Sequence, residues 1–305
     1  MTLSNTAFLF PGQGSQIVGM GKELAQQLPA VRELYDQAAE ILDYDLASIC
    51  FEGPEEQLNS TEHSQPALFV TSLAALESLK QSDPELVAGC GATAGLSLGE
   101  YTSLVFAGVM NFADGLKVVR QRGLAMQAAA DAEPSGMVSI LGLPQEDVER
   151  LCTSCQQEGE IIQPANFLCP GNLVVSGHIE ACKRIAKMAA EAGAIRAIPL
   201  TVAGAFHTPL MEEAVGKLAE VLAGVDLQQP RLPVISNVDA QQHDDPEEIR
   251  DLLIQQVVSP VQWEASMRQL LTDGFDQYYE VGPGRTMRGL LRRIDKKIKC
   301  ENVTC

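Results

Sequence analysis

The hexapeptide Gly95-Leu96-Ser97-Leu98-Gly99-Glu100 is the most informative segment of this chain. The small, apolar residues 87–94 before it read as a buried strand, and residues 101–107 after it as a helix with one apolar face. A Gly-x-Ser-x-Gly sequence between a strand and a helix predicts a nucleophile elbow, a tight turn that exposes its serine. Ser97 is thus a candidate nucleophile, with the N–H of Leu98 facing any oxyanion formed beside it. The alternative is a strand–helix junction whose small residues only permit close packing.

The composition describes a globular protein with a strongly acidic balance. The 305 residues can bury a substantial core, as one large domain or as a large domain with a smaller one. A formal net charge of −18 argues against binding to nucleic acid or to an anionic membrane. No apolar run approaches the length of a bilayer span, and the N-terminus lacks the pattern of a signal peptide. We therefore expect a cytoplasmic protein, or an organellar one after processing.

The eight cysteines are scattered, and only Cys152 and Cys155 form a Cys-x-x-Cys pair. No second pair lies at the spacing of a zinc finger, and the surrounding residues 146–157 read as an amphipathic helix. Structural thiols in a reducing compartment are therefore favoured over a metal or redox site, and we expect no bound metal.

The order of the predicted elements indicates an α/β fold with two subdomains. Residues 6–10 read as a buried parallel strand that ends at Pro11-Gly12-Gln13-Gly14, before a helix. Residues 135–202 read as strand, helix, strand, strand, helix, strand, the order of a ferredoxin-like unit. We therefore predict an α/β-hydrolase-like catalytic domain with a parallel sheet, residues 1–134 and 203–305, and an inserted ferredoxin-like (βαββαβ) subdomain, residues 135–202. A cleft between two domains is a usual place for a small-molecule site.

A serine nucleophile needs a base, and His207 is the best placed of the four histidines. It follows directly after the inserted unit, beside glycine and other small residues, where its imidazole can reach Ser97 Oγ. The other three lie in polar loops or after a strand: His63, His178 and His243. The alternative for a lone histidine is an ordinary place in the core or on the surface.

Other candidate residues are weaker when they are taken one at a time. Gln65 lies just before an apolar helix predicted for residues 67–79, where a buried amide could orient groups of a site. Arg122 lies on a helix predicted for residues 113–130, and most helix arginines are solvated. After a last predicted strand at residues 278–281, a tail helix carries seven cations: Arg285, Arg288, Arg292, Arg293, Lys296, Lys297 and Lys299.

Five motifs occur in one order along the chain: Phe10-Pro11-Gly12-Gln13-Gly14, Gly95-Leu96-Ser97-Leu98-Gly99-Glu100, Arg122-Gly123-x-x-Met126-Gln127, Gly204-Ala205-Phe206-His207 and Gln256-x-x-x-Pro260-Val261-x-Trp263. Together they resemble the malonyl-CoA:acyl carrier protein transacylases of fatty acid synthesis and the acyltransferase domains of polyketide synthases. The resemblance covers nearly the whole chain. Each motif alone is weak, but five in register are highly specific.

The resemblance implies an active site made of a serine–histidine dyad. In this site Ser97 carries the acyl group, His207 is the general acid and base, and the backbone carbonyl of Gln256 steadies the imidazole. The backbone N–H groups of Gln13 and Leu98 form the oxyanion hole. Members of the family thus use a carbonyl in place of the aspartate of a hydrolase triad.

The resemblance also implies the substrate. Arg122 would bind the malonyl carboxylate as a bidentate fork, which lysine could not reproduce. Gln65 matches a glutamine that lines the site, and Phe206 matches a phenylalanine associated with malonyl rather than methylmalonyl groups. The implied reaction is ping-pong transfer of malonyl from malonyl-CoA to the phosphopantetheine thiol of an acyl carrier protein. It supplies fatty acid elongation and uses no bound cofactor.

The implied carrier protein is usually acidic, as this chain is, so docking needs a local basic patch. The tail cations from Arg285 to Lys299, together with Lys117, are the candidates. The alternative is a solvated helix whose cations are favoured by the helix dipole. We expect no nucleic-acid or membrane partner, and we expect the protein to act as a monomer.

The chain departs from the family's pattern at two places. Leu96 stands where the family commonly has histidine, and Phe167-Leu168-Cys169-Pro170-Gly171 stands where the inserted unit often has Asn-Ser-Pro-Gly. Leu96 is not the predicted base, so we expect activity to be kept while the packing or polarity behind the nucleophile changes.

Two functions of other classes stay open. A serine esterase shares the elbow, but it needs a carboxylate beside the histidine, for which Asp131 or Glu133 would have to serve. A non-catalytic acyl-CoA-binding or assembly protein would form no stable acyl-enzyme although Ser97 is present.

Overall fold

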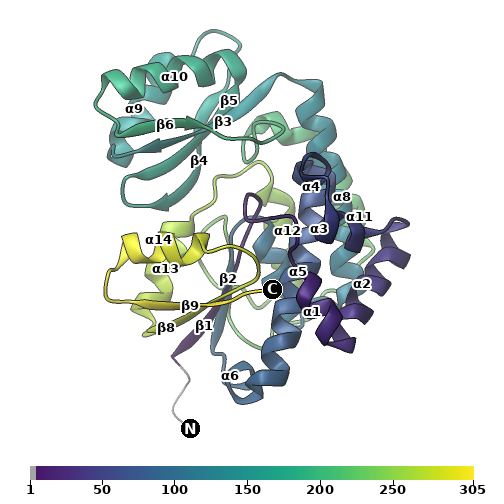
Figure 1. Cartoon of the computed structure of the whole chain (residues 1–305). Coiled ribbons are helices and arrows are strands. Elements are labelled where there is room, and N and C mark those ends of the chain that lie inside the picture. Colours follow the sequence, from purple (N-terminus) through teal and green to yellow (C-terminus); the bar gives the residue numbers. More distant parts are fainter. Residues whose placement is uncertain (1–4) are drawn as a thin grey trace.

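The computed structural model describes residues 5–305 as two subdomains, each built on its own sheet (Figure 1). The larger subdomain contains a five-stranded sheet in the order β7-β2-β1-β8-β9, with every neighbouring pair parallel. Its strands are β1 (Thr6–Phe10), β2 (Ala92–Gly95), β7 (Val234–Ile235), β8 (Gln277–Val281) and β9 (Lys299–Val303). The predicted α/β fold with a parallel sheet in its large domain is confirmed.

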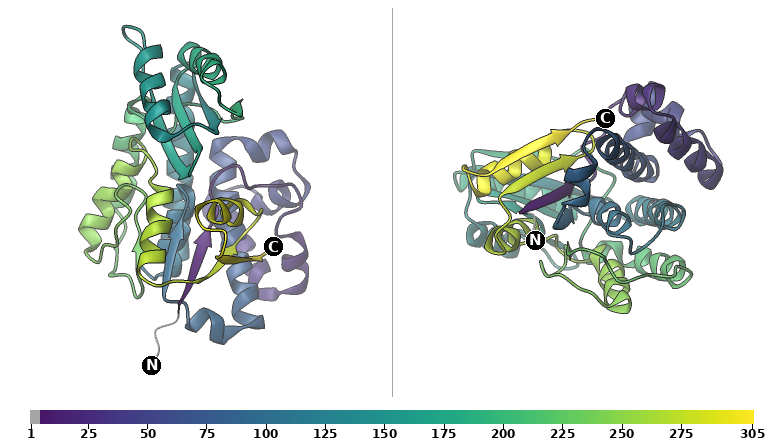
Figure 2. Two further views of the ribbon diagram at one scale, coloured as in Figure 1. Left: turned by 90° about the vertical axis from the view of Figure 1, so that its left-hand side faces the viewer. Right: turned by 90° about the horizontal axis from the view of Figure 1, so that it is seen from below.

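Helices lie on both faces of the parallel sheet (Figure 2). Those of the large subdomain are α1 (Lys22–Gln27), α2 (Pro29–Leu42), α3 (Leu46–Glu52), α4 (Glu55–Asn59), α5 (Thr61–Ser82), α6 (Pro84–Ala88), α7 (Leu98–Phe106), α8 (Phe112–Ala132), α11 (Glu212–Ala223), α12 (Pro246–Gln256), α13 (Trp263–Thr272) and α14 (Thr286–Ile294), with a short 3₁₀ helix at Pro209–Met211. Among residues 5–305, no helix is both long and apolar enough to cross a bilayer.

Strand β1 is buried along its whole length and divides its side chains between two cores. Phe8 and Phe10 belong to the core formed with α5, α7, α8 and α11, whereas Ala7 and Leu9 belong to the core formed with α13 and α14. A parallel strand buried on both faces reads as a continuous apolar run. The run at residues 6–10 is therefore what this central position requires.

Strand β2 is shorter than residues 87–94, so that prediction is wrong over its first part. Residues 84–88 form helix α6 instead, and only Ala92–Gly95 pair with β1. The physical reason is a helix start signal. The side chain of Asp83 accepts the N–H of Leu86 at 3.0 Å, and Pro84 occupies the first helical position.

Helix α5 begins earlier than residue 67, so Gln65 lies inside the helix rather than before it. Pro66 stands within the second turn, where its missing N–H removes only the bond to the carbonyl of residue 62. The helix therefore continues through the proline. Gln65 is completely buried as a result.

The smaller subdomain contains a four-stranded antiparallel sheet in the order β4-β5-β3-β6. Its elements follow the predicted order: β3 (Ser135–Leu141), α9 (Gln145–Cys155), β4 (Ile162–Cys169), β5 (Asn172–His178), α10 (Ile179–Glu191) and β6 (Arg196–Pro199). Val138 and Val175 pack against α9 and α10 on one face of the sheet, while Met137 and Val174 join the large core on the other. The face of this sheet that α9 and α10 do not cover is thus turned toward the large subdomain (Figure 1).

Backbone bonds tie β4 to the segment before α13. Phe167 donates to the carbonyl of Val261 at 2.9 Å, and Val261 donates to the carbonyl of Ala165 at 2.8 Å. Farther along, Arg293 Nη2 donates to the carbonyl of Gly171 at 3.3 Å. These contacts fix one side of the space between the subdomains.

The strand predicted at residues 278–281 is present as β8, but it is not the last strand, and the cations that follow it do not all lie on one helix. Helix α14 ends at Ile294, and Lys299–Val303 form β9, which pairs with β8 in parallel register. In this strand Cys300 is buried between two exposed charged neighbours. Apolar and polar residues alternate over only a few positions here, and most of these residues are polar. The sequence of this segment therefore gives little indication of a strand.

Candidate active site

The turn at Ser97 has the geometry of a nucleophile elbow. Ser97 joins β2 to α7 with φ 51° and ψ −102°, a conformation that a residue with a side chain rarely adopts. A Cβ at Gly95 would lie 1.9 Å from the backbone of Gly99, and a Cβ at Gly99 would lie 2.1 Å from the carbonyl oxygen of Phe10. Both positions therefore require glycine, and the strained backbone between them marks Ser97 as a candidate functional residue.

Asn237 clamps both sides of this turn. Its Oδ1 accepts the N–H of Ser97 at 2.6 Å, and its Nδ2 donates to the carbonyl of Gly95 at 2.7 Å. Asn237 is completely buried and follows β7 by two residues. A single side chain thus satisfies two polar groups that the strained turn cannot pair within a strand or helix.

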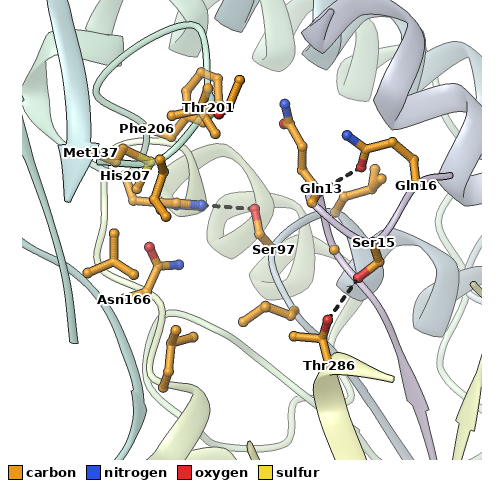
Figure 3. Close-up of a pocket in the computed structure, with 18 of the residues that line it drawn as sticks. Gln13, Ser15, Gln16, Ser97, Met137, Asn166, Thr201, Phe206, His207 and Thr286 are labelled. Atoms are coloured by element: carbon orange, nitrogen blue, oxygen red, sulfur yellow. Dashed lines mark hydrogen bonds between the residues drawn. The ribbon is translucent and has the colours of Figure 1, made fainter. Parts of the chain in front are cut away.

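Ser97 and His207 form a hydrogen-bonded pair, as predicted. Ser97 Oγ lies 2.9 Å from His207 Nε2, and His207 Nδ1 lies 2.8 Å from the backbone oxygen of Gln256. A carbonyl can only accept, so Nδ1 carries the hydrogen and Nε2 is free to accept the serine proton. Figure 3 shows the hydroxyl and the ring facing each other, with Gln13 on the other side of Ser97.

The environment of His207 keeps its imidazole neutral. Burial, and next the positive charge of Arg122, lower the pKa of His207 to about 4. The residue is 3% exposed. At neutral pH the residue is therefore a base that is ready to accept a proton.

Arg122 is a buried arginine, only 2% exposed, rather than a solvated one. Its Nη1 donates to Gln65 Oε1 at 2.7 Å, and its Nη2 donates to Gln256 Oε1 and to Ser97 Oγ, each at 2.9 Å. Its guanidinium also lies over the Tyr101 ring, 5.2 Å from the centroid. The structure thus gathers three predicted site residues around the side chain of a fourth.

The buried carboxyl of Glu100 is hydrogen-bonded to two of the residues described above. Its Oε2 accepts the side-chain amide of Gln256 at 2.6 Å and the backbone N–H of Asn237 at 3.1 Å. Burial raises the pKa of Glu100 to about 7. The carboxyl therefore links the clamp at Ser97 to the residue that holds both His207 and Arg122. Neither Glu100 nor Asn237 is predicted from the sequence as a site residue.

A cavity of about 490 Å³ opens in front of the pair, between the two subdomains. The predicted residues that line it are Gln13, Ser97, Leu98, Arg122, Phe206 and His207, and the two departures Leu96 and Leu168 line it as well. The small subdomain adds Met137, Asn166 and Val174. Gln65 and Gln256 do not line the cavity; they lie behind Arg122.

The other titratable candidates lie elsewhere. His63 is in the first turn of α5, not in a loop, with Nδ1 2.7 Å from Ser60 Oγ. Asp131 accepts a bond from Gln127, and Glu133 lies 3.6 Å from His178. The two carboxylates that an esterase would need thus have partners other than His207.

Within residues 5–305, no three side chains of His, Cys, Asp or Glu are grouped so as to hold a metal ion. All eight cysteines are free. Cys152, Cys155 and Cys182 lie in the core of the small subdomain. Burial raises the pKa of the Cys152 thiol to about 12, which makes it a poor nucleophile.

Replacing Asn237 by aspartate should weaken the clamp without changing its size. The variant cannot donate to Gly95 and brings a charge beside Glu100. We expect it to lower kcat by roughly tenfold or more with little effect on KM, since the orientation of Ser97 governs attack. It should also cost about 1–3 kcal/mol of stability because a buried carbonyl loses its donor. Steady-state kinetics and thermal unfolding measure both. Unaltered kcat in a folded variant would show that the clamp is dispensable.

The chain is similar to known proteins along nearly its whole length. A family model described as the acyl transferase domain matches residues 7–299. The chain is 43% identical over 299 residues to the malonyl CoA-acyl carrier protein transacylase of Bacillus subtilis, covering 97% of this chain and 92% of that protein. It is 45% identical over 298 residues to the mitochondrial malonyl-CoA-acyl carrier protein transacylase of Homo sapiens, covering 94% and 76%.

The fold is also shared with solved structures. One is the malonyl-transacylase PlMCAT in complex with AntF, a type II polyketide synthase acyl-carrier protein. It matches with a TM-score of 0.93 and 38% identity, over 98% of this chain and 96% of that one. The likeness in sequence and in fold thus extends over nearly the whole length of the chain. The chain belongs to the acyl transferase family.

Proposed function

We propose that this protein transfers the malonyl group of malonyl-CoA to the phosphopantetheine thiol of an acyl carrier protein, through a malonyl ester on Ser97. The observation that carries the proposal is the position of one oxygen. Ser97 Oγ lies 2.9 Å from a neutral, buried base and 2.9 Å from a buried guanidinium. The first contact suits nucleophilic attack and the second suits an acyl group that ends in a carboxylate. The names of the relatives support the same substrate pair.

The reaction occurs in two half-reactions. His207 Nε2 takes the hydroxyl proton as Ser97 Oγ attacks the thioester carbonyl, and the N–H groups of Gln13 and Leu98 stabilise the oxyanion. The carbon–sulfur bond then breaks, and His207 returns the proton to the sulfur of CoA. In the second half-reaction the carrier thiol gives its proton to His207 and attacks the serine ester, which restores the Ser97 hydroxyl.

Arg122 selects the acyl group in this proposal. Two nitrogens of its fork would face the two carboxylate oxygens of malonyl, while an acetyl group would leave a buried charge unpaired. Phe206 lines the same cavity and is 5% exposed, so its ring would crowd a branch at the α-carbon. Malonyl is therefore favoured over both acetyl and methylmalonyl.

A transfer assay tests the proposed function against hydrolysis. Labelled malonyl-CoA is mixed with the protein and with either a carrier bearing phosphopantetheine or the same carrier without it. We expect label on the first carrier only, formed faster than free malonate. Release of malonate at the higher rate would instead support the esterase.

The pH dependence should reflect the lowered pKa of His207. Only the neutral ring accepts the serine proton, so kcat/KM for malonyl-CoA should fall as pH drops through about 4 and not near 6.5. An unfolded chain binds this proton already below about 6.5. Stability should thus also decline as pH falls from there toward 4. A kcat/KM midpoint close to 6.5 in a folded protein would contradict the buried, charge-repelled ring.

Docking of the carrier is proposed at the exposed face of α14. Arg285, Arg288 and Arg292 are spaced as neighbours on one side of this helix, and all three are exposed. Thr286 and Leu290 of the same helix line the cavity, so a bound carrier can send its arm toward Ser97. Arg293 is excluded from the patch because it bonds the small subdomain, and Lys296 and Lys297 follow the helix in a turn.

Reversing the charge of these three arginines should change the KM for the carrier but not the KM for malonyl-CoA. The triple variant Arg285→Glu, Arg288→Glu, Arg292→Glu is expected to raise KM for an acidic carrier roughly tenfold or more and to leave KM for malonyl-CoA unchanged. A matched control reverses three exposed cations on the outer helices of the small subdomain: Arg150→Glu, Lys183→Glu and Lys187→Glu. Equal effects of the two triple variants would count against a patch on α14.

The site needs no second copy of the chain, because the elbow, the base and the arginine all come from one molecule. We therefore propose that the protein acts as a monomer. Its eight free cysteines suit a reducing compartment such as the cytoplasm.

A further inference from the structure

Arg122 contacts the attacking oxygen itself, in addition to lying near the acyl site. Its Nη2 lies 2.9 Å from Ser97 Oγ, and His207 Nε2 lies at the same distance from that oxygen. A guanidinium has hydrogens but no acceptor, so Arg122 can only donate to the oxygen. Ser97 therefore donates its hydrogen to His207 and receives one from Arg122.

We propose that this contact is a cap: in the free protein the hydrogen bond from Arg122 Nη2 restrains the Ser97 oxygen. The carboxylate of an entering acyl group releases that oxygen by accepting the Nη2 hydrogen bond in its place. The inference rests on the proposed function, since it assumes that Ser97 is the acylated residue. In this proposal the substrate carboxylate activates the nucleophile in addition to contributing to binding.

The cap slows attack because the lone pairs of the hydroxyl are what attack the carbonyl. A hydrogen bond from a cation draws electron density from the oxygen and directs a lone pair toward the guanidinium. Hydrogen bonds with a charged partner are shorter and stronger than neutral ones. Breaking one before attack corresponds to a slowing of roughly tenfold to a hundredfold.

The geometry decides which bond of Arg122 the carboxylate would replace. Gln65 and Gln256 are 0% and 1% exposed and do not line the cavity. Gln256 is held in turn by Glu100. Of the three acceptors around the guanidinium, only Ser97 Oγ faces the space where an acyl group enters. A carboxylate, a stronger acceptor than a hydroxyl, therefore displaces Ser97 and leaves the two glutamines in place.

The same exchange strengthens the base. The charge of Arg122 contributes, after burial, to the lowered pKa of His207. A carboxylate paired with the guanidinium offsets that charge, so the ring accepts the serine proton more readily. Uncapping of the oxygen and activation of the base thus follow from one binding event.

Formate and acetyl-CoA provide a direct test, because an acetyl group with formate beside it imitates malonyl in shape and charge. The quantity measured is the single-turnover rate of acetyl-enzyme formation, followed by acid quenching and intact-protein mass spectrometry. In this step the bond from Ser97 Oγ to the acyl carbon forms and the carbon–sulfur bond breaks. The serine proton passes through His207 to the sulfur of CoA. Sodium chloride at equal ionic strength and formamide, the neutral analogue of formate, are the controls.

We expect formate, but neither control, to accelerate acetylation of the native protein roughly tenfold. Arg122→Ala should acetylate faster than the native protein without formate and should not respond to it. Labelling of Ser97 by a neutral sulfonyl fluoride should show the same acceleration by formate, and like the first arm it needs no variant. The cap is refuted if formate leaves both rates of the native protein unchanged while malonyl-CoA still labels Ser97. Absence of malonyl labelling would instead overturn the proposed function, and the cap with it.

Discussion

Ser97→Ala is expected to form no malonyl-enzyme and to reduce transfer to the carrier by about 10⁴-fold or more. The variant keeps the cavity and Arg122, so malonyl-CoA should still bind, but no oxygen remains to accept the acyl group. Loss of a nucleophile commonly removes nearly all of the covalent rate enhancement. His207→Ala should lower the rate by roughly 10³-fold or more, because the hydroxyl must then lose its proton to water.

The control for this loss is a serine outside the site. Ser154 on α9 is exposed and bonds only a carbonyl of its own helix, so Ser154→Ala should transfer malonyl at the native rate. Binding of malonyl-CoA to Ser97→Ala by calorimetry shows whether the cavity is intact. A variant that binds malonyl-CoA and still transfers at an appreciable rate would rule out the serine ester.

Arg122→Ala is expected to lower kcat/KM for malonyl-CoA by about 100-fold or more while acetyl transfer is maintained or rises. The fork for the carboxylate is lost, which removes the discrimination of malonyl from acetyl. Arg122→Lys should recover little, because a single ammonium cannot keep the contacts with Gln65, Gln256 and the substrate at once. Competition between malonyl-CoA and acetyl-CoA, read from the masses of the acyl-enzymes, measures the ratio.

Lys117→Ala serves as the matched control, since it removes an exposed cation from the same helix. Its malonyl-to-acetyl ratio should equal that of the native protein. If Arg122→Ala folds and keeps the native ratio, the arginine does not choose the acyl group.

The elbow could be predicted from sequence because its causes are local. A Cβ at Gly95 would collide with the backbone of Gly99, so both partners of this contact lie within the five-residue motif. The order of strands and helices in the small subdomain is local in the same sense. Short elements are harder to predict from sequence. Helix α6 depends on one capping aspartate, and β9 has almost no alternation of apolar and polar residues.

The residues that hydrogen-bond to the elbow are distant from it in sequence, so no local pattern predicts them. Glu100 stands inside the predicted motif, yet its bonds reach Asn237 and Gln256, 137 and 156 residues away. Asn237 lies after a two-residue strand and shows no pattern of its own. The sequence of α8 alone suggests a solvated Arg122, and the side chain is buried because residues of α5, α7 and α12 surround it.

The most direct test of the account is the mass of the protein after exposure to malonyl-CoA alone. We predict the addition of one malonyl group, mapped to the peptide that contains Ser97, and its complete transfer once a carrier with a phosphopantetheine thiol is added. An unmodified mass, or a malonyl group attached to any other residue, would contradict the account.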